Sequence, residues 1–138
     1  MNYIKVEKPK HSDERGQLVE FLTRKELPKN APFGHIYFVT FTKRGVVRGN
    51  HYHQKKDEYF GIAYGKVRLV IEDIKTKKRK SFILSATSPQ FVRIKIGPNI
   101  AHAVESLSPK AVLIDYFPIP YDPNNPDNHP YILINPKK

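Results

Sequence analysis

The sequence predicts an all-β domain, built as a sandwich or a barrel. Short segments rich in valine, isoleucine, phenylalanine and tyrosine recur along the chain, with the alternation of apolar and polar residues expected of half-buried strands. Proline, glycine and asparagine separate these segments at the close spacing typical of antiparallel strands. The predicted strands are Leu18–Leu22, His35–Thr42, Tyr59–Tyr64, Val67–Glu72, Ser81–Leu84, Phe91–Ile96, Ala103–Leu107 and Ala111–Pro118.

The two ends of the chain differ from this regular middle. Ser12–Arg24 offers a helical alternative, which Gly16 disfavours because glycine loses much conformational freedom in a helix. Prolines remove backbone donors from about residue 118 onward, so we expect an extended segment there that wraps the surface. Tyr131–Ile134 is predicted to add a last short strand. With 138 residues and no evident linker, we expect one domain over 1–138.

The composition narrows the class of protein. Cysteine is absent, which excludes disulfides, thiolate metal ligands and a cysteine nucleophile. Residues 1–6 are too short in apolar residues for a signal peptide, and no later stretch reaches the roughly 18 apolar residues of a membrane helix. We therefore expect a soluble, cytoplasmic protein without a membrane partner.

The positive charge points to an anionic partner. The formal net charge is +11, which favours nucleic acid, nucleotides or phosphorylated sugars. The densest basic run, Lys75–Lys80, lies between two predicted strands, where a solvated hairpin turn is expected. Because no motif combines aromatic and basic residues for base stacking, nucleic acid is not the expected partner.

Two histidines and a glutamate form the most informative cluster. Alternate residues of a strand share a face, so His51 and His53 point the same way, and Glu58 follows at a distance suited to a returning strand. His102 is the candidate for a third imidazole. These ligand types suit a divalent metal, with zinc first and iron, manganese or nickel as alternatives. No organic cofactor is expected.

The same cluster resembles the first cupin motif, G-(x)5-H-x-H-(x)4-E-(x)6-G, at every fixed position. The second motif, P-x-G-x-x-H, is degraded, because Gly97 and Asn99 stand at the proline and glycine positions. The resemblance implies a single-domain cupin, which is a double-stranded β-helix or jelly-roll barrel. The motif residues that this chain retains are Gly45, His51, His53, Glu58, Gly65 and His102.

Two further sequence segments indicate which cupin enzymes the chain resembles most. Asp13–Glu20 resembles the D-x-R-G-x-L-x-E segment of the dTDP-4-dehydrorhamnose 3,5-epimerases and the dTDP-sugar 3,4-ketoisomerases, and Val47–His51 resembles their L-R-G-x-H segment. From about Ser12 to Pro126, the chain is most similar to the C-terminal cupin domain of bifunctional capsular polysaccharide epimerase/reductase enzymes. The resemblance implies a nucleotide-diphosphate sugar as substrate and a homodimer that exchanges N-terminal strands.

Roles for individual residues follow from this resemblance. Arg15 and Arg48 would contact the diphosphate, since a guanidinium donates parallel hydrogen bonds to phosphate oxygens, and Glu20 would hold the nucleotide or ribose. His51 aligns with the catalytic base of the 3,5-epimerases, and the His51–His53 pair aligns with the paired histidines of the ketoisomerases. Tyr116 lies one position from the opposing tyrosine acid, and core packing is the equal alternative for it.

Three functions remain open at this point. The first is an epimerase or ketoisomerase that removes a proton next to the ketone of a nucleotide-linked 4-keto-6-deoxy sugar. The second is a non-catalytic cupin that binds a metal or a sugar nucleotide, and the third is a metal-dependent oxygenase. A metal would compete with the first role of His51, because one imidazole cannot be both a metal ligand and a free base.

Overall fold

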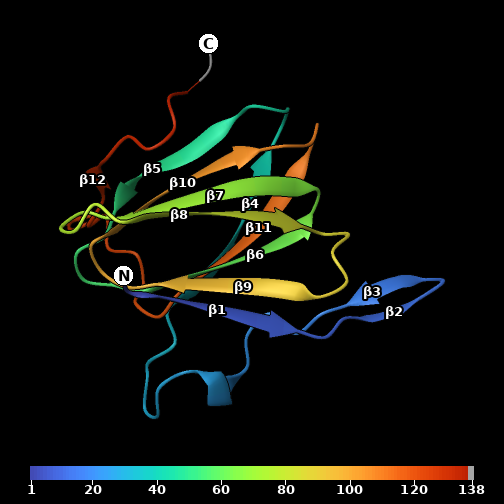
Figure 1. Ribbon diagram of the computed structural model, residues 1–138. Helices are drawn as coiled ribbons and strands as arrows, with labels where there is room; N and C mark the ends of the chain where they lie inside the picture. The colour runs from blue at the N-terminus through green and yellow to red at the C-terminus, as the bar shows by residue number, and fades with distance from the viewer. Residues whose placement is uncertain (137–138) are drawn as a thin grey trace.

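Two antiparallel sheets face each other in the computed structural model, which describes residues 1–136 (Figure 1). One sheet has the order β1 (Tyr3–Lys8), β9 (Phe91–Ile96), β6 (Glu58–Tyr64), β11 (Ala111–Phe117), β4 (His35–Phe41). The other has the order β12 (His129–Pro130), β5 (Val47–Tyr52), β10 (Ile100–Ser106), β7 (Lys66–Asp73), β8 (Arg79–Ser85). This arrangement is a jelly-roll barrel, so the predicted cupin fold class is confirmed.

The apolar core fills the space between the sheets. Leu69 and Ile71 alternate on β7, Ile94 and Ile96 alternate on β9, and all four are at most 1% exposed. Side chains from both sheets therefore meet in one cluster, as the period-two pattern requires. The candidate site lies between the same two sheets, so the packing of this core positions the strands that line it.

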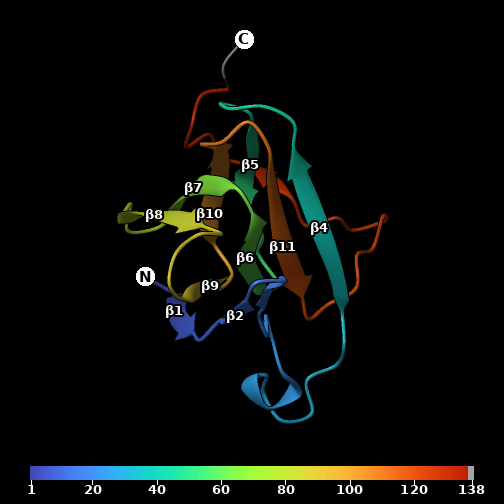
Figure 2. The same ribbon diagram turned by 90° about the vertical axis from the view of Figure 1, so that its right-hand side faces the viewer.

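The N-terminal region forms a hairpin. Strands β2 (His11–Asp13) and β3 (Gly16–Leu18) pair with each other and project from the barrel in Figure 1, whereas Figure 2 looks at this hairpin end-on. The helical alternative for Ser12–Arg24 and the strand Leu18–Leu22 are therefore wrong. The reason is local: Gly16 has a φ of 131° and the Asp13 carboxylate accepts the Arg15 backbone N–H at 2.8 Å, which closes a tight turn.

One helical element is present among the described residues, the 3-10 helix η1 (Arg24–Glu26). Within residues 1–136, no helix has the length and apolar character that crossing a membrane would need.

Three other strands differ from the sequence prediction. Strand β1 was not predicted, because its exposed polar residues hide the pattern of an edge strand that pairs with β9. Strand β5 was not marked as a separate element, although His51 and His53 were expected on a strand. The last strand is His129–Pro130 and not Tyr131–Ile134, whose backbone is instead held by Asn50: its side chain oxygen accepts N–H groups of Leu133 and Ile134.

Strand β5 approaches β10 closely at a backbone irregularity. Gly49 and Asn50 have φ values of 90° and 59°, and the β5–β10 register shifts between His102 and Ala103. A Cβ atom on Gly49 would lie 2.9 Å from the His102 carbonyl oxygen. Glycine at this position therefore allows the strand that carries His51 to pack against the strand that carries His102.

Replacing Gly49 with alanine is expected to destabilise the protein by about 1–3 kcal/mol, because the new methyl group meets backbone in a conformation that L side chains avoid. Urea unfolding monitored by circular dichroism measures the change. Gly16→Ala is the matched control: its φ is also positive, at 131°, but no atom of the described residues lies within 4 Å of the added Cβ. A loss in Gly49→Ala no larger than that in the control would contradict the packing argument.

Candidate active site

A cavity of about 200 Å³ lies between the two sheets. Side chains from β4, β5, β6, β10 and β11 line it, together with residues of the β5–β6 loop and of the C-terminal segment. Its apolar lining comes from Val39, Phe41, Phe60, Val104, Leu113 and Phe117. The polar groups gather among these apolar walls, where water does not screen them from one another.

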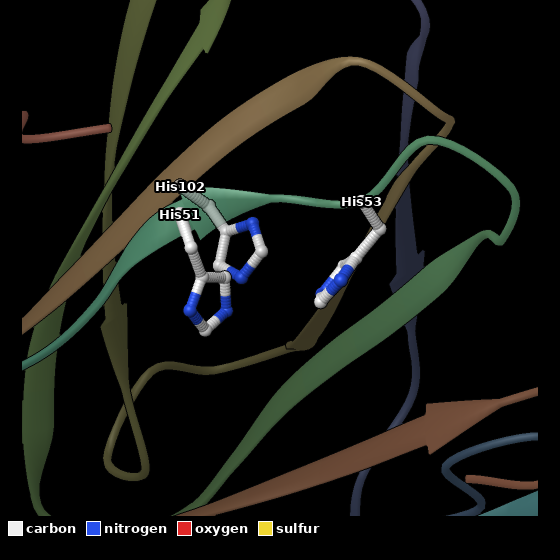
Figure 3. A group of neighbouring side chains, drawn as sticks. All are labelled: His51, His53 and His102. Carbon is white, nitrogen blue, oxygen red and sulfur yellow. The ribbon is translucent and has the colours of Figure 1, made fainter. Parts of the chain in front are cut away.

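Three histidines converge in this cavity (Figure 3). His51 and His102 are direct partners in the β5–β10 register, and His53 follows the end of β5 on the same side. One ring nitrogen from each histidine lies within 4.8 Å of the others. The structure therefore brings together the three imidazoles that the sequence placed on separate segments.

Glu58, the first residue of β6, completes the group from the opposite sheet. Its Oε1 atom lies 3.1 Å from His53 Nε2 and 3.2 Å from His102 Nε2. Its residue is 3% exposed, so the carboxyl group has almost no contact with solvent. All four metal-ligand candidates of the sequence thus meet in one place.

Burial keeps the histidines neutral. It lowers the pKa of His51 to about 4, with smaller contributions from the neighbouring His53 and the charge of Lys56. The pKa of His102 falls well below its usual value for the same reason, since it is buried and faces two other imidazoles. The pKa of His53 is lowered chiefly by burial as well. Neutral imidazoles at neutral pH are the form that binds metals.

Two buried carboxyl groups share the opposite wall. Burial raises the pKa of Glu58 to about 8, and burial together with the Glu58 charge raises that of Asp115 well above its usual range. The two side chains are hydrogen-bonded to each other, and Asp115 Oδ1 has no further partner among the described residues. Like charges this close cannot both form readily in an apolar cavity, so the pair retains a proton near neutral pH.

The donor set fits a divalent cation. Three imidazole nitrogens and one carboxylate oxygen are ligands for zinc and for several transition metals. His53 Nδ1 is 2.8 Å from the Asp127 carbonyl oxygen, which accepts a hydrogen bond and leaves Nε2 free to face Glu58. Such an outer hydrogen bond orients a ligating histidine and fixes its tautomer. His51, His53, Glu58 and His102 are therefore the residues that could hold a metal.

Of the predicted substrate-binding residues, the structure brings one to the cavity. Arg48 lines it beside His51. Arg15 lies in the projecting hairpin, where its side chain is 84% exposed and pairs with Asp13, and Glu20 is exposed in the following segment. Within this one chain, neither Arg15 nor Glu20 reaches the histidines.

Tyr116 also lies away from the cavity. It is buried on the other face of β11, beside Phe33 and Tyr59, where it lines an apolar groove. Its neighbour Asp115 faces the cavity instead, because successive residues of a strand point to opposite faces. The position of Tyr116 therefore corresponds to the packing alternative and not to the acid.

Among the acidic and basic residues that line the cavity, the sequence reasoning missed Asp115 and Lys56. The sequence pattern could have indicated Asp115, because Leu113, Asp115 and Phe117 are alternate residues of β11 and all three face the cavity. Lys56 lies in the β5–β6 loop, where no periodicity indicates which way a side chain points.

Comparison with protein families gives a match over most of the chain. The model of the polysaccharide biosynthesis C-terminal domain matches residues 11–129. The spore coat polysaccharide biosynthesis protein SpsL of Bacillus subtilis (strain 168) is 31% identical over 131 residues, which are 90% of this chain and 84% of that protein.

A second curated relative is much longer than this chain. The UDP-2-acetamido-2,6-beta-L-arabino-hexul-4-ose reductase of Pseudomonas aeruginosa (strain ATCC 29260 / BCRC 12902 / CIP 102967 / NCIMB 11965 / PA103) is 41% identical over 68 residues. These residues are 49% of this chain and 16% of the reductase.

Among solved structures, the chain is similar in fold to ChmJ, a 3'-monoepimerase from Streptomyces bikiniensis crystallised in complex with dTDP-quinovose. The TM-score is 0.79 with 20% sequence identity, over 94% of this chain and 69% of ChmJ. This likeness concerns the barrel, in which the four convergent side chains described above lie.

Proposed function

The chain belongs to the polysaccharide biosynthesis C-terminal domain family, and from this premise we propose that it is an epimerase or ketoisomerase of nucleotide-diphosphate-linked 4-keto-6-deoxy sugars. The observation that carries the proposal is the apolar cavity in which neutral imidazoles lie beside a buried carboxyl pair that retains a proton. Inversion next to a ketone requires one group that accepts a proton and another that returns one, and this cavity contains groups of both kinds.

The chemistry begins with a proton on the carbon next to the ketone. A neutral imidazole accepts this proton while the C–H electron pair forms a carbon–carbon double bond and the ketone oxygen becomes an enolate. Return of a proton to the other face of the carbon inverts it. His51 is the candidate base, and the exclusion of water from the apolar walls protects the enolate.

We further propose that His51, His53, Glu58 and His102 hold a divalent metal, zinc first. The convergence of the three imidazoles, which are neutral, and the position of Glu58 Oε1 beside His53 and His102 support this assignment. A bound cation would act as a Lewis acid on the ketone oxygen or would serve the structure of the site. In that case His51 is a ligand, and the base is another group.

The shape of the surroundings suggests how an extended substrate lies. The inner cavity is smaller than the roughly 300–1,000 Å³ of typical ligand pockets, but a second hollow of about 410 Å³ shares Arg48, His51 and Asn128 with it. We place the sugar ring in the inner cavity and the nucleotide in the outer hollow. Arg48 then lies at the junction, where its guanidinium can bind the diphosphate.

Deuterium exchange observed by NMR tests the proposed function. The protein, with and without chelator, is incubated in D2O with dTDP- and UDP-linked 4-keto-6-deoxy sugars. We expect loss of the proton signal at C3 or C5, and the position of the loss identifies the carbon attacked. Sensitivity to chelator would assign the metal a role. No exchange with any of these sugars, in folded and metal-loaded protein, would refute the enzyme proposal.

A non-catalytic cupin is the second candidate, and the position of Tyr116 favours it. The tyrosine that the resemblance assigned as acid lies outside the cavity. Under this alternative the protein binds the sugar nucleotide for a separate reductase. Binding detected by calorimetry without any exchange at C3 or C5 is its signature.

We also propose a homodimer, in which the projecting hairpin of one chain reaches its partner. Leu18, Phe33, Ile36 and Phe38 are 58–75% exposed. Phe33 and Ile36 also line an apolar groove with Ile114 and Tyr116 of β11. Covering this surface would bury apolar area and could carry Arg15 toward the partner's cavity. The hairpin would then supply a residue that a single chain lacks at the site.

Phe38→Glu is expected to convert the dimer to a monomer, because it replaces the most exposed of these apolar side chains with a charge. Light scattering after size-exclusion chromatography measures the mass. The exposed Ile83→Glu on β8, in the other sheet, is the matched control and should leave the mass unchanged. A monomeric wild-type protein would refute the proposal.

A further inference from the structure

Lys56 is a buried cation that forms no ion pair with a carboxylate among the described residues. Its residue is 9% exposed, and its side chain lines the cavity. The Nζ atom lies 4.7 Å from the centre of the Phe117 ring, and within residues 1–136 its ammonium has no hydrogen bond or ion pair. An ammonium taken out of water without a counter-charge costs free energy, which a cation–π contact offsets in part.

The inward position of Lys56 follows from a clamp on its loop. The two carboxylate oxygens of Asp127 accept the backbone N–H groups of Gln54 and Lys55, each at 2.9 Å. This clamp leaves the Lys55 side chain exposed and turns the next residue into the cavity. Two adjacent lysines thus differ completely in their surroundings, although the sequence does not distinguish them.

The surrounding groups leave the Lys56 charge available. Asp57, the adjacent carboxyl in sequence, pairs with Lys95, whose Nζ atom lies 3.7 Å from its Oδ2 atom. Glu58 has its Oε1 atom shared between His53 and His102, and it is hydrogen-bonded to Asp115. The Lys56 charge acts on three groups of the cavity, since it is among the causes that lower the pKa of His51 and His53 and that oppose the rise in the pKa of Glu58. A fixed positive charge in an apolar cavity is suited to a negative charge that the ligand brings or develops.

We propose that Lys56 binds the C4 oxygen of the keto sugar and stabilises the enolate formed when the neighbouring proton is removed. The step is internally balanced: the base takes the proton, the C–H pair becomes the double bond, and the carbonyl pair moves onto the oxygen that Lys56 contacts. Reprotonation reverses these movements. This inference rests on the proposed function and adds to it the residue that bears the developing charge.

Lys56→Met tests the role with Lys55→Met as the matched control. We expect Lys56→Met to slow deuterium exchange about 10²- to 10³-fold, because a positioned charge is removed from the transition state. Affinity for dTDP alone should stay within about twofold of wild type, since the lysine contacts the sugar and not the diphosphate. Lys55→Met should exchange at the wild-type rate, and Lys56→Arg should recover part of the loss.

Unchanged exchange in Lys56→Met would overturn the proposal. A large loss of dTDP affinity in this variant would overturn it too, because it would assign Lys56 to the diphosphate. Both outcomes are interpretable only in folded protein, so urea unfolding accompanies each variant.

A second measurement uses the wild-type protein and does not depend on turnover. With 15N-labelled lysine, the Lys56 Nζ signal should shift when a dTDP-linked 4-keto sugar is added and stay in place with dTDP alone. Absence of a shift with the keto sugar would overturn the proposal. If the shift occurs but no proton exchanges, the contact stands and the proposed function fails, so the two failures are distinguishable.

Discussion

Replacing His51 with asparagine is expected to lower the rate of deuterium exchange into the keto sugar by about 10²- to 10⁴-fold. The imidazole lies in the cavity in its neutral form, and burial lowers its pKa to about 4. Asparagine retains a polar side chain of similar reach but can neither accept the proton nor replace imidazole as a strong ligand. NMR of the C3 and C5 protons in D2O measures the rate.

Metal content separates the two roles of His51. If His51 is a ligand, metal stoichiometry falls in His51→Asn as it does in His102→Asn, and exchange falls with it. If His51 is a free base, His51→Asn keeps its metal and loses exchange alone. His129→Asn is the control, since this histidine lies outside the cavity and contacts Asp127 and Tyr52. Exchange at the wild-type rate together with wild-type metal content in His51→Asn would exclude both roles.

The candidate metal site could be predicted because it depends on strand periodicity. His51 and His53 are two residues apart, which places them on one face whether or not the strand ends are known. The position of His102 opposite His51 needed the register of β5 and β10, which the sequence does not contain. The cupin resemblance supplied this long-range pairing, and the structure agrees with it.

The carboxyl group that β11 contributes to the cavity could not be predicted, because successive side chains of a strand point to opposite faces of the sheet. Tyr116 was a candidate at one position from the expected place, and that single step puts it in the outer groove and Asp115 in the cavity. Lys56 was missed for a different reason. Its direction depends on Asp127, which is 71 residues further along the chain, and no local pattern reports such a contact.

Of the two predicted diphosphate-binding arginines, the structure places Arg48 at the cavity and Arg15 away from it. Arg48 lies on β5 close to the histidines, so its place follows from the strand that carries them. Arg15 lies in a hairpin that projects from the barrel, where Asp13 is its one side-chain partner within residues 1–136. A residue that functions in a neighbouring subunit cannot be located from the fold of a single chain.

The metal-free protein is expected to be most stable near pH 6.5 and to lose stability on both sides. On the acid side, burial depresses the pKa of His51 to about 4 and those of His53 and His102 below their usual value. Below about pH 6.5 the histidines of the unfolded chain therefore bind protons, while those of the folded cavity stay neutral. Stability falls as the pH falls. His51 alone accounts for at most about 3 kcal/mol by pH 4, less after solvent screening.

On the alkaline side, the carboxyl pair makes the folded state less stable as the pH rises, which is opposite to the effect of the histidines. Burial raises the pKa of Glu58 to about 8 and that of Asp115 well above its usual range, so the folded state holds protons that the unfolded chain has released. Their contribution is fully present below about pH 4.5 and is lost as the pH rises through the folded pKa values. Above pH 6.5 the histidines no longer oppose this loss, and stability declines.

A divalent metal is expected to remove the alkaline decline, because its charge replaces the proton on Glu58 and its affinity rises as competing protons leave. Urea unfolding from pH 4 to 9, after EDTA treatment and again with zinc, measures both curves.

Glu58→Gln is the matched variant. Its amide cannot ionise, so it should flatten the alkaline decline without metal and should abolish the stabilisation by zinc. Metal-free wild-type protein that grows steadily more stable up to pH 9 would contradict the carboxyl-pair argument. Equal stabilisation of Glu58→Gln and wild type by zinc would remove Glu58 from the ligand set and leave the three histidines as its candidates.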